Sequence, residues 1–277
     1  MRKIELGKTS EKVSVIGYGT YRLGGGWKKS DFSKDDESVD AIRTAASYGS
    51  TFIDTAEAYG AGHSEELVGK AVSQMISKGE LEREDLFIAT KVSEEHLSYD
   101  DVIRSCNQSL RRLGVEQIDL YQIHWPNPHI KLSETMRAME DLVKEGKVRY
   151  LGVCNFSVEL FEEARQNLAK QELHSDQVSY SVFDRAPEES LLGFCKREHI
   201  TLIAYSPLGA GHKWQEMPKA VLALAERYNK SPAQIALNWL LSRGPVLPIP
   251  KAGVKDHIRQ NCEAADFELS AEEYAQI

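Results

Sequence analysis

The stretch TFIDTAEAYGAGHSEELVG, residues 51–69, holds the pattern that decides the fold. Its opening residues, TFIDT, are mostly apolar or β-branched, which is typical of a buried strand. From Ser64 onward, apolar side chains recur at the i, i+3, i+4 spacing of an amphipathic helix. The stretch therefore predicts a strand followed by a helix, with Asp54, Tyr59 and His63 around the connection.

The same alternation of strand and helix recurs along the chain. Runs that predict strands cover residues 13–20, 51–55, 86–92, 118–124, 148–156, 176–183, 200–207 and 245–252. Segments that open on or next to Ser or Asp, an N-cap signal, predict helices over 64–79, 100–114, 132–147, 157–170 and 231–244. Eight strands with intervening helices predict an α/β fold, the (βα)8 TIM barrel, and an open doubly wound sheet is the alternative.

The N-terminal stretch RKIELGKTSEKVSVIG, residues 2–17, alternates around a GKTSEK turn and predicts a small β-hairpin ahead of the barrel. No linker, internal repeat or low-complexity segment divides the chain. We therefore expect a single domain over residues 1–277.

The composition limits the classes of partner. The formal net charge is −8 and the isoelectric point is near 5.6, which argues against a broad nucleic-acid or anionic-membrane surface. The N-terminus MRKIELGK lacks the apolar core of a secretory signal, and no apolar run is long enough to span a membrane. The four cysteines show no CxxC pairing. We expect a soluble cytoplasmic protein with a small-molecule substrate, reduced thiols and no metal site.

Polar residues adjoin nearly every predicted strand, mostly at its C-terminal end. In a (βα)8 barrel these ends meet on one rim, where catalytic groups stand. The residues placed there are Asp54, Lys91, His124, Asn155, Gln177, Tyr205, Ser206 and Lys251. Each alone has an ordinary structural explanation, such as a solvated lysine or a core histidine. Their joint placement, with Tyr59 above Asp54, predicts an active site.

Four of these residues suit the protonation of a carbonyl oxygen. A free tyrosine has a pKa of about 10, and a buried ammonium beside it would favour the phenolate and lower that pKa. Tyr59 is then a candidate general acid, with Lys91 and Asp54 as its tuning pair. His124 would donate a hydrogen bond to the carbonyl oxygen and orient it.

The set lacks a reductant, and no activated nucleophile or metal-ligand spacing is evident. When a carbonyl oxygen is protonated with no nucleophile and no metal at hand, the expected reaction is reduction by hydride from a cofactor. The stretch GYGTYRLG, residues 17–24, fails the GxGxxG spacing of a dinucleotide fingerprint. The better phosphate site is IPKAGVKDHIRQN, residues 249–261, where Lys251, Lys255, His257 and Arg259 precede or open a predicted helix.

These residues bring out a resemblance that covers essentially the whole chain. The sequence resembles the aldo-keto reductase superfamily, and GHSEELVG is similar to its bacterial and archaeal branches, which reduce small aldehydes, ketones and sugars. The matching stretches are GYGTY at 17–21, IDTAEAYGAGHSEELVG at 53–69, TK at 90–91, IDLYQIHWP at 118–126, GKVRYLGVCNF at 146–156, AYSPLGAG at 204–211, IPKAG at 249–253 and QN at 260–261.

The resemblance implies a cofactor, NADPH in preference to NADH, laid across the C-terminal mouth of the barrel. It implies that Asp54, Tyr59, Lys91 and His124 form the catalytic tetrad. The implied cofactor-binding residues are Gly19, Thr20, Tyr21, Asp54, Cys154, Asn155, Gln177, Tyr205, Ser206, Pro207, Leu208, Lys251, Lys255, His257, Gln260 and Asn261.

Three residues depart from the family pattern. Cys154 stands where a serine usually precedes the carboxamide-binding Asn155, Ala252 replaces a hydroxyl residue, and His257 replaces a 2′-phosphate-binding arginine. The last two alter contacts that favour NADPH, although Lys251, Lys255 and Arg259 leave positive charge there.

The substrate pocket is expected to be open, because the loop after His124 and the C-terminal segment are short. Its expected lining is Tyr21, Trp27, Tyr59, His124 and Trp125. We expect a reductase of aldehydes and ketones to alcohols. The alternative is a cofactor-binding regulatory subunit of the same fold with little turnover. A barrel hydrolase would need two facing strand-end acids, and Asp54 stands alone.

Overall fold

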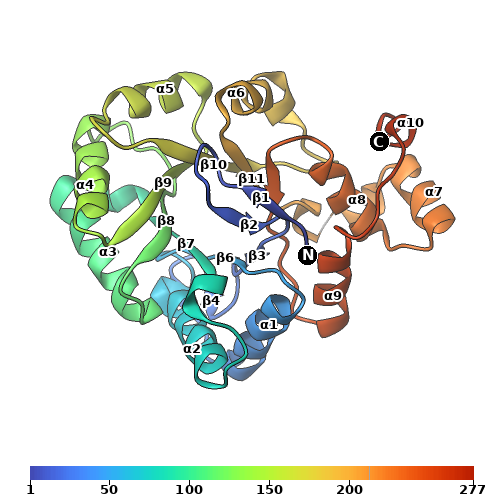
Figure 1. The fold of residues 1–277 in the computed structure, drawn as a ribbon, viewed down its shortest axis with the longest axis horizontal. Coiled ribbons are helices and arrows are strands. Elements are labelled where there is room, and N and C mark those ends of the chain that lie inside the picture. The colour runs from blue at the N-terminus through green and yellow to red at the C-terminus, as the bar shows by residue number, and fades with distance from the viewer. Residues whose placement is uncertain (212) are drawn as a thin grey trace.

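A computed structural model describes residues 1–211 and 213–277 of the chain. Eight strands form one parallel sheet in the order β12-β11-β10-β9-β8-β7-β6-β3. Helices surround these strands as an outer ring (Figure 1). The strands of the sheet are β3 (Tyr18–Gly19), β6 (Phe52–Asp54), β7 (Phe87–Val92), β8 (Ile118–Ile123), β9 (Val148–Cys154), β10 (Leu173–Ser179), β11 (Thr201–Tyr205) and β12 (Val246–Pro248).

The helices follow the strands in sequence. They are α1 (Asp35–Ser47), α2 (His63–Ser77), α3 (Tyr99–Leu113), α4 (Leu132–Lys144), α5 (Val158–Gln166), α6 (Leu191–Glu198), α7 (Lys219–Tyr228), α8 (Pro232–Leu241), α9 (Lys255–Glu263) and α10 (Ala271–Tyr274). Short 3₁₀ segments are η1 (Gly60–Gly62), η2 (Arg83–Asp85), η3 (Glu94–His96), η4 (Ala186–Glu189), η5 (Gly209–Gly211) and η6 (Trp214–Glu216).

The two edges of the sheet approach each other. The backbone N–H groups of Gly17 and Gly19 donate to the carbonyl oxygens of Pro248 and Pro250, at 2.9 and 3.3 Å. This curled parallel sheet with its helices is consistent with the (βα)8 barrel expected from the sequence. The expectation of a single domain stays a prediction.

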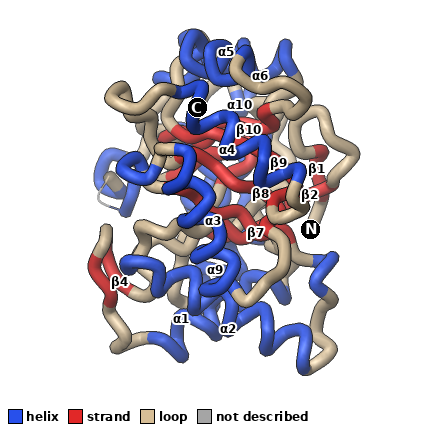
Figure 2. Tube along the Cα trace, turned by 90° about the vertical axis from the view of Figure 1, so that its left-hand side faces the viewer, coloured by secondary structure: helices blue, strands red, loops and turns tan. Residues whose placement is uncertain are grey.

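The expected N-terminal hairpin is confirmed as β1 (Lys3–Glu5) paired antiparallel with β2 (Lys12–Ser14). The run expected as one strand over 13–20 is divided between β2 and β3. Ser14 explains part of this break, because its hydroxyl donates to Ile16 O and accepts from Phe52 N. A second hairpin, β4 (Gly25–Gly26) with β5 (Lys29–Ser30), lies at the opposite end of the sheet from β1 and β2 (Figure 2).

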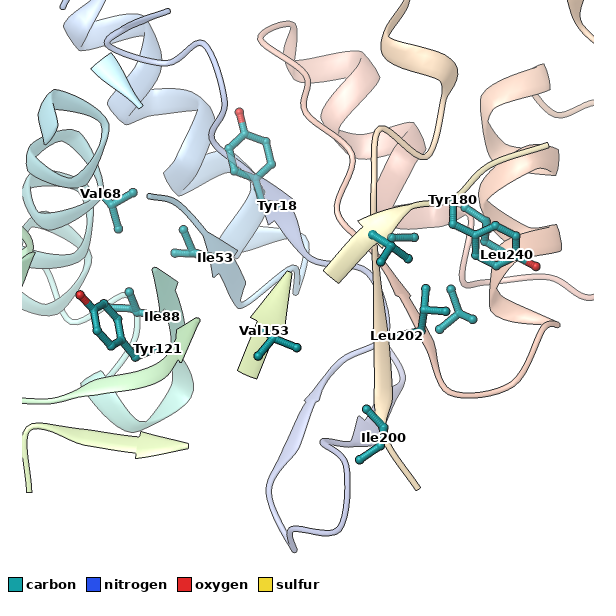
Figure 3. Packing of buried hydrophobic residues seen from close by; sticks show 14 of the residues in the cluster. Tyr18, Ile53, Val68, Ile88, Tyr121, Val153, Tyr180, Ile200, Leu202 and Leu240 are labelled. Atoms are coloured by element: carbon teal, nitrogen blue, oxygen red, sulfur yellow. The ribbon is translucent and has the colours of Figure 1, made fainter. Parts of the chain in front are cut away.

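Apolar side chains fill both sides of the sheet. Inside it, Leu6 and Val13 from the first hairpin belong to one buried cluster with Phe52 and Phe87, whose rings stack at 5.2 Å. Outside it, the side chains that face the helices form a larger cluster. Figure 3 shows Ile53 and Ile88 there, near Val68 of α2. The hairpin therefore closes the N-terminal end, and the opposite end stays available for a site.

The N-cap signals in the sequence were right for α5 and α8 and wrong for α2 and α4. Ser157 and Ser231 accept hydrogen bonds from Leu160 N and Gln234 N. Gly62 and Lys131 occupy the N-cap positions of α2 and α4. The hydroxyl of Ser64 is used elsewhere, because it bonds Thr20 and Thr55 inside the protein.

Within the described residues, no helix has the length and apolar character needed to cross a membrane. The same part of the chain contains no cluster of three or more His, Cys, Asp or Glu side chains suited to a metal ion. Cys106, Cys154, Cys195 and Cys262 are buried and free. The cytoplasmic location stays a prediction.

Asp119 in β8 joins three elements at the N-terminal end of the sheet. Its buried carboxylate accepts from Arg83, Arg149 and the backbone N–H of Ile88, at 2.7 to 2.8 Å. We expect Asp119→Ala to lower the free energy of unfolding by about 2 kcal/mol, because three donors lose their acceptor. Urea denaturation measures the change.

Glu268→Ala is the matched control, because Glu268 pairs with Arg2 and its side chain is 76% exposed. We expect that variant to stay within about 0.5 kcal/mol of the parent. Equal losses in the two variants would contradict the role given to Asp119.

Candidate active site

A buried ion pair lies where β6 and β7 end. Lys91 Nζ lies 2.7 Å from Asp54 Oδ2 and 2.8 Å from the carbonyl oxygen of Thr55. The two residues are at most 1% exposed. Register explains their meeting, since Asp54 pairs with Ala89 across neighbouring parallel strands and Lys91 lies two residues farther along. The pair is therefore set by the sheet and sits at its C-terminal end.

Tyr59 stands above this pair in the connection between β6 and α2. Its hydroxyl lies 3.4 Å from Lys91 Nζ, and its own backbone N–H donates to Ala56 O. Gly60 follows with a φ of +58°, and a side chain there would collide with the backbone of Gly24. This tight turn aims the phenol toward Lys91.

Burial and the neighbouring charges have opposite effects on the pKa values of Tyr59 and Lys91. Burial raises the pKa of Tyr59 above its ordinary value, and the attraction of Lys91 only partly opposes that rise. The expectation of a lowered tyrosine pKa is therefore wrong, although Lys91 acts in the expected direction. Burial alone would lower the pKa of Lys91, but the negative charge of Asp54 outweighs it and holds the ammonium protonated. The phenol and the ammonium both carry their protons at neutral pH.

His124 follows β8 and completes the group. Its ring lies 5.5 Å from that of Tyr59 and 4.9 Å from that of Trp27. Burial, with the positive charges of Lys91 and Lys28, lowers the pKa of His124 to about 2. The ring is therefore neutral at physiological pH. Its Nδ1 has no hydrogen-bond partner among the described residues.

Two side-chain amides continue the network across the sheet. Gln177 of β10 donates to Asp54 Oδ1 at 2.8 Å, and Asn155 donates to the carbonyl oxygen of His124 at 3.1 Å. Tyr205 in turn donates to Asn155 Oδ1 at 3.0 Å. Ser206 has a φ of 49°, a costly conformation for a residue other than glycine, and Asn155 has a φ of 62°, which asparagine tolerates. Such strain is common where a backbone is shaped around a ligand.

These groups open into one cavity of about 1080 Å³. The expected site residues that line it are Gly19, Tyr21, Trp27, Asp54, Tyr59, His124, Trp125, Cys154, Asn155, Gln177, Tyr205, Ser206, Pro207, Leu208, Lys251, His257, Gln260 and Asn261. Lys91 lies behind Asp54 and Tyr59 and reaches the cavity through them. The sheet thus gathers in one cavity most of the residues expected from the sequence.

Two expected cofactor residues lie outside that cavity wall. Thr20 is fully buried, and its hydroxyl is 2.8 Å from that of Ser64. Lys255 pairs with Asp40 of α1 at 2.9 Å. Arg259 is also neutralised within the protein, by Asp256 and Glu263. Lys251 is therefore the cation of this segment that faces the cavity.

Positive charge gathers around Lys251 itself. Partial loss of hydration, with the charges of Arg22 and Lys34, lowers the pKa of Lys251. Arg22 lines the same cavity. Such a concentration of positive charge suits an anion with more than one oxygen.

Cys154 lies in the cavity wall beside the ion pair. Burial raises the pKa of its thiol well above the ordinary value, so the group stays a neutral thiol. It is a weaker hydrogen-bond donor than the serine hydroxyl for which it stands.

Known proteins resemble this chain over nearly its whole length. The model of the Aldo/keto reductase family matches residues 15–277. The chain belongs to the aldo-keto reductase family. A thermostable aldo-keto reductase, solved with the inhibitor epalrestat, superposes on it with a TM-score of 0.93 and 43% identity, over 99% of this chain and 98% of that one.

Two further relatives are similar over most of their length. An aldo-keto reductase from Klebsiella pneumoniae in complex with NADPH has a TM-score of 0.88 and 34% identity, covering 99% of this chain and 93% of that chain. A methylglyoxal reductase of Escherichia coli is 34% identical over 268 residues, which is 96% of this chain and 90% of that protein.

The structure of this aldo-keto reductase also brings residues to the cavity that the sequence analysis missed. They are Arg22, Ala210, Trp214, Ser231, Pro232 and Ala233. Ile249, Pro250, Ala252 and Gly253 also line the cavity, and they belong to the stretch 249–261 that was predicted to bind phosphate. Arg22 directly follows Tyr21 after a predicted strand, so its position carried a usable signal. Trp214 and Ser231 reach the cavity from segments far from any strand end, which no local pattern identifies.

Proposed function

We propose that this aldo-keto reductase reduces small aldehydes and ketones to alcohols with NADPH. The observation that carries the proposal is Lys91 Nζ, held 2.7 Å from Asp54 and 3.4 Å from the Tyr59 hydroxyl at the cavity floor. The Tyr59 hydroxyl carries its proton at neutral pH, and Lys91 beside it favours the phenolate that transfer of this proton to a carbonyl oxygen would leave. NADPH, when bound, supplies the hydride that adds to the carbonyl carbon.

Different residues supply the proton and orient the carbonyl group. Tyr59 gives its proton to the oxygen as negative charge develops there. Lys91 stabilises the phenolate that remains, and Asp54 keeps Lys91 charged and in place. His124 donates from its neutral ring to the carbonyl oxygen and orients it, as a group with a depressed pKa can do without carrying charge.

The residues present fit the nicotinamide cofactor. Asn155 and Gln177 would hold the carboxamide. Each amide nitrogen already donates one hydrogen within the protein, so the contacts to the cofactor would use its second hydrogen or the amide oxygen. Tyr205 would stack on the nicotinamide ring. Ser206, Pro207 and Leu208 would lie along the pyrophosphate, and Asn261 would meet the adenine.

The preference for NADPH rests on Lys251, with Arg22 beside it. Ala252 and His257 supply weaker contacts than the residues usual in the family, and Lys255 and Arg259 are engaged by acids elsewhere. The complex of the Klebsiella pneumoniae relative with NADPH supports this preference.

The substrate end favours small and apolar carbonyl compounds. Tyr21, Trp27 and Trp125 surround Tyr59 and His124 there, and all three are about 40% exposed, which describes an open aromatic rim. The Escherichia coli relative is a methylglyoxal reductase, so methylglyoxal and a simple aromatic aldehyde are the substrates to test first.

We expect Tyr59→Phe to lower kcat/KM for such an aldehyde by about 10²- to 10⁴-fold, because the proton donor is lost. The dissociation constant for NADPH should stay within about two-fold, since the phenol binds the reacting oxygen rather than the cofactor. Stopped-flow absorbance at the NADPH band and fluorescence titration measure the two quantities.

Tyr48→Phe is the control, because Tyr48 is exposed at the end of α1 and should leave both quantities unchanged. Retention of near-parental activity in Tyr59→Phe would overturn the assignment of the donor. NADPH binding by the parent with no turnover of any aldehyde would favour the regulatory alternative.

Two lysines of the same segment, Lys251 and Lys255, allow a controlled test of the contact to the 2′-phosphate. We expect Lys251→Met to weaken NADPH binding by about ten-fold and NADH binding far less, because only NADPH carries the 2′-phosphate. Lys255→Met should change neither, since Lys255 pairs with Asp40. Dissociation constants for both cofactors test this, and equal losses of NADPH affinity in the two variants would refute the assignment.

A further inference from the structure

His63 opens α2 outside the cavity and is held from both sides. Its Nδ1 lies 2.7 Å from Glu66 Oε2 and its Nε2 lies 2.8 Å from Asp35 Oδ1 of α1. The residue is 7% exposed, and the ring of Phe32 covers it at 4.2 Å. The sequence placed His63 near the connection between a strand and a helix, and the structure shows that it joins α1 to α2.

The two carboxylates require a doubly protonated ring. An ionised carboxylate only accepts hydrogen bonds, whereas a neutral imidazole has one N–H to donate. Both contacts are satisfied together only by the imidazolium. Burial tends to lower the pKa of His63, but the hydrogen bonds and charges of Glu66 and Asp35 outweigh it and raise that pKa above its ordinary value.

The charges around His63 come from three helices. α1 supplies Asp35 and α2 supplies Glu66. α3 supplies Arg112, which lies against Gly62, but its guanidinium pairs with Glu65 at 2.6 Å. The two carboxylates are therefore the groups that set the charge of the ring.

The segment over His63 carries Trp27. Gly24 packs so closely on the ring that a Cβ there would lie 2.9 Å from His63 Cδ2. The hairpin of β4 and β5 then returns, with Asp31 N–H donating to Gly24 O at 2.8 Å. Within it, Lys28 N–H donates to Ala58 O at 2.8 Å, and Trp27 pairs with Tyr59 through a backbone bridge. Residues 24–35 thus run from the His63 contact over the catalytic tyrosine and back to Asp35.

We propose that His63, as an imidazolium, is a positioning residue that clamps residues 24–35 and thereby holds Trp27 over the substrate end of the cavity. Its effect on KM rests on the proposed function. Its effect on the mobility of residues 24–35 rests on the clamp alone. The clamp is complete below the ordinary histidine pKa and is lost as the pH rises through the raised pKa of the folded protein. Loss of the proton leaves one carboxylate without a donor and loosens the segment, which the backbone bonds of Lys28 and Trp27 then still attach to the loop of Tyr59.

The kinetic test compares the parent with His63→Gln, which can keep one hydrogen bond but carries no charge. Between about pH 6 and pH 9, the parent's KM for an aromatic aldehyde should rise with pH. The variant's KM should be about three-fold higher at low pH and independent of pH, with kcat changed less than two-fold. A parental pH profile of KM in the variant would overturn the proposal.

His199→Asn is the control, because His199 is an exposed residue with a φ of 54° at the end of α6, a conformation that asparagine tolerates. It should keep the parent's profile of KM against pH.

Two further measurements need no turnover. Long-range ¹H–¹⁵N spectra of the parent should show both ring nitrogens of His63 protonated at neutral pH, and a neutral ring would overturn the proposal. Hydrogen exchange should be about ten-fold faster over residues 24–35 in His63→Gln and unchanged over β7 and β8. If the protein reduces no aldehyde but both measurements succeed, the proposed function fails and the clamp stands. Unchanged exchange over residues 24–35 would refute the clamp itself.

Discussion

The buried ion pair of Lys91 and Asp54 is the constraint on which the site depends. An ion moved from water into a protein interior loses several kcal/mol of hydration, so a charged lysine that is 0% exposed must be fully compensated. Asp54, the Thr55 carbonyl and Gln177 provide that compensation, in which Gln177 holds the second oxygen of Asp54. The polar floor of the cavity is organised around this one charge.

The charge of Lys91 also affects the protonation of Tyr59 and His124, which lie above it. Tyr59 keeps its proton because burial outweighs the pull of Lys91, whereas His124 loses its proton because burial and Lys91 act in the same direction. In the proposed reaction, the neutral phenol of Tyr59 gives its proton to the carbonyl oxygen and the neutral ring of His124 orients that oxygen. In the proposed function, the aromatic rim and the hairpin held by His63 select the carbonyl compounds that reach that donor.

The sequence was most informative where a strand defines a position. The order of the strands and the meeting of Asp54, Lys91 and His124 followed from apolar runs and from the rule that parallel strands end on one rim. Thr20 was assigned by resemblance alone, and Lys255 was assigned from the positive charge at the start of a predicted helix. The structure turns both toward protein partners, Ser64 and Asp40.

Other features depend on contacts between distant residues. The direction of the Tyr59 pKa required the depth of burial, which composition does not give. The clamp at His63 required α1 to approach α2, since Asp35 lies 28 positions earlier in the chain. Arg22 and Trp214 reach the cavity through loops whose paths are set by packing.

The coupling of Lys91 and Asp54 is tested most directly by a double-mutant cycle on kcat/KM, with Lys91→Met, Asp54→Asn and the double variant. If the two residues act as one unit, the double variant loses about as much activity as the worse single variant. Losses that multiply, so that the free-energy penalties add, would contradict the account.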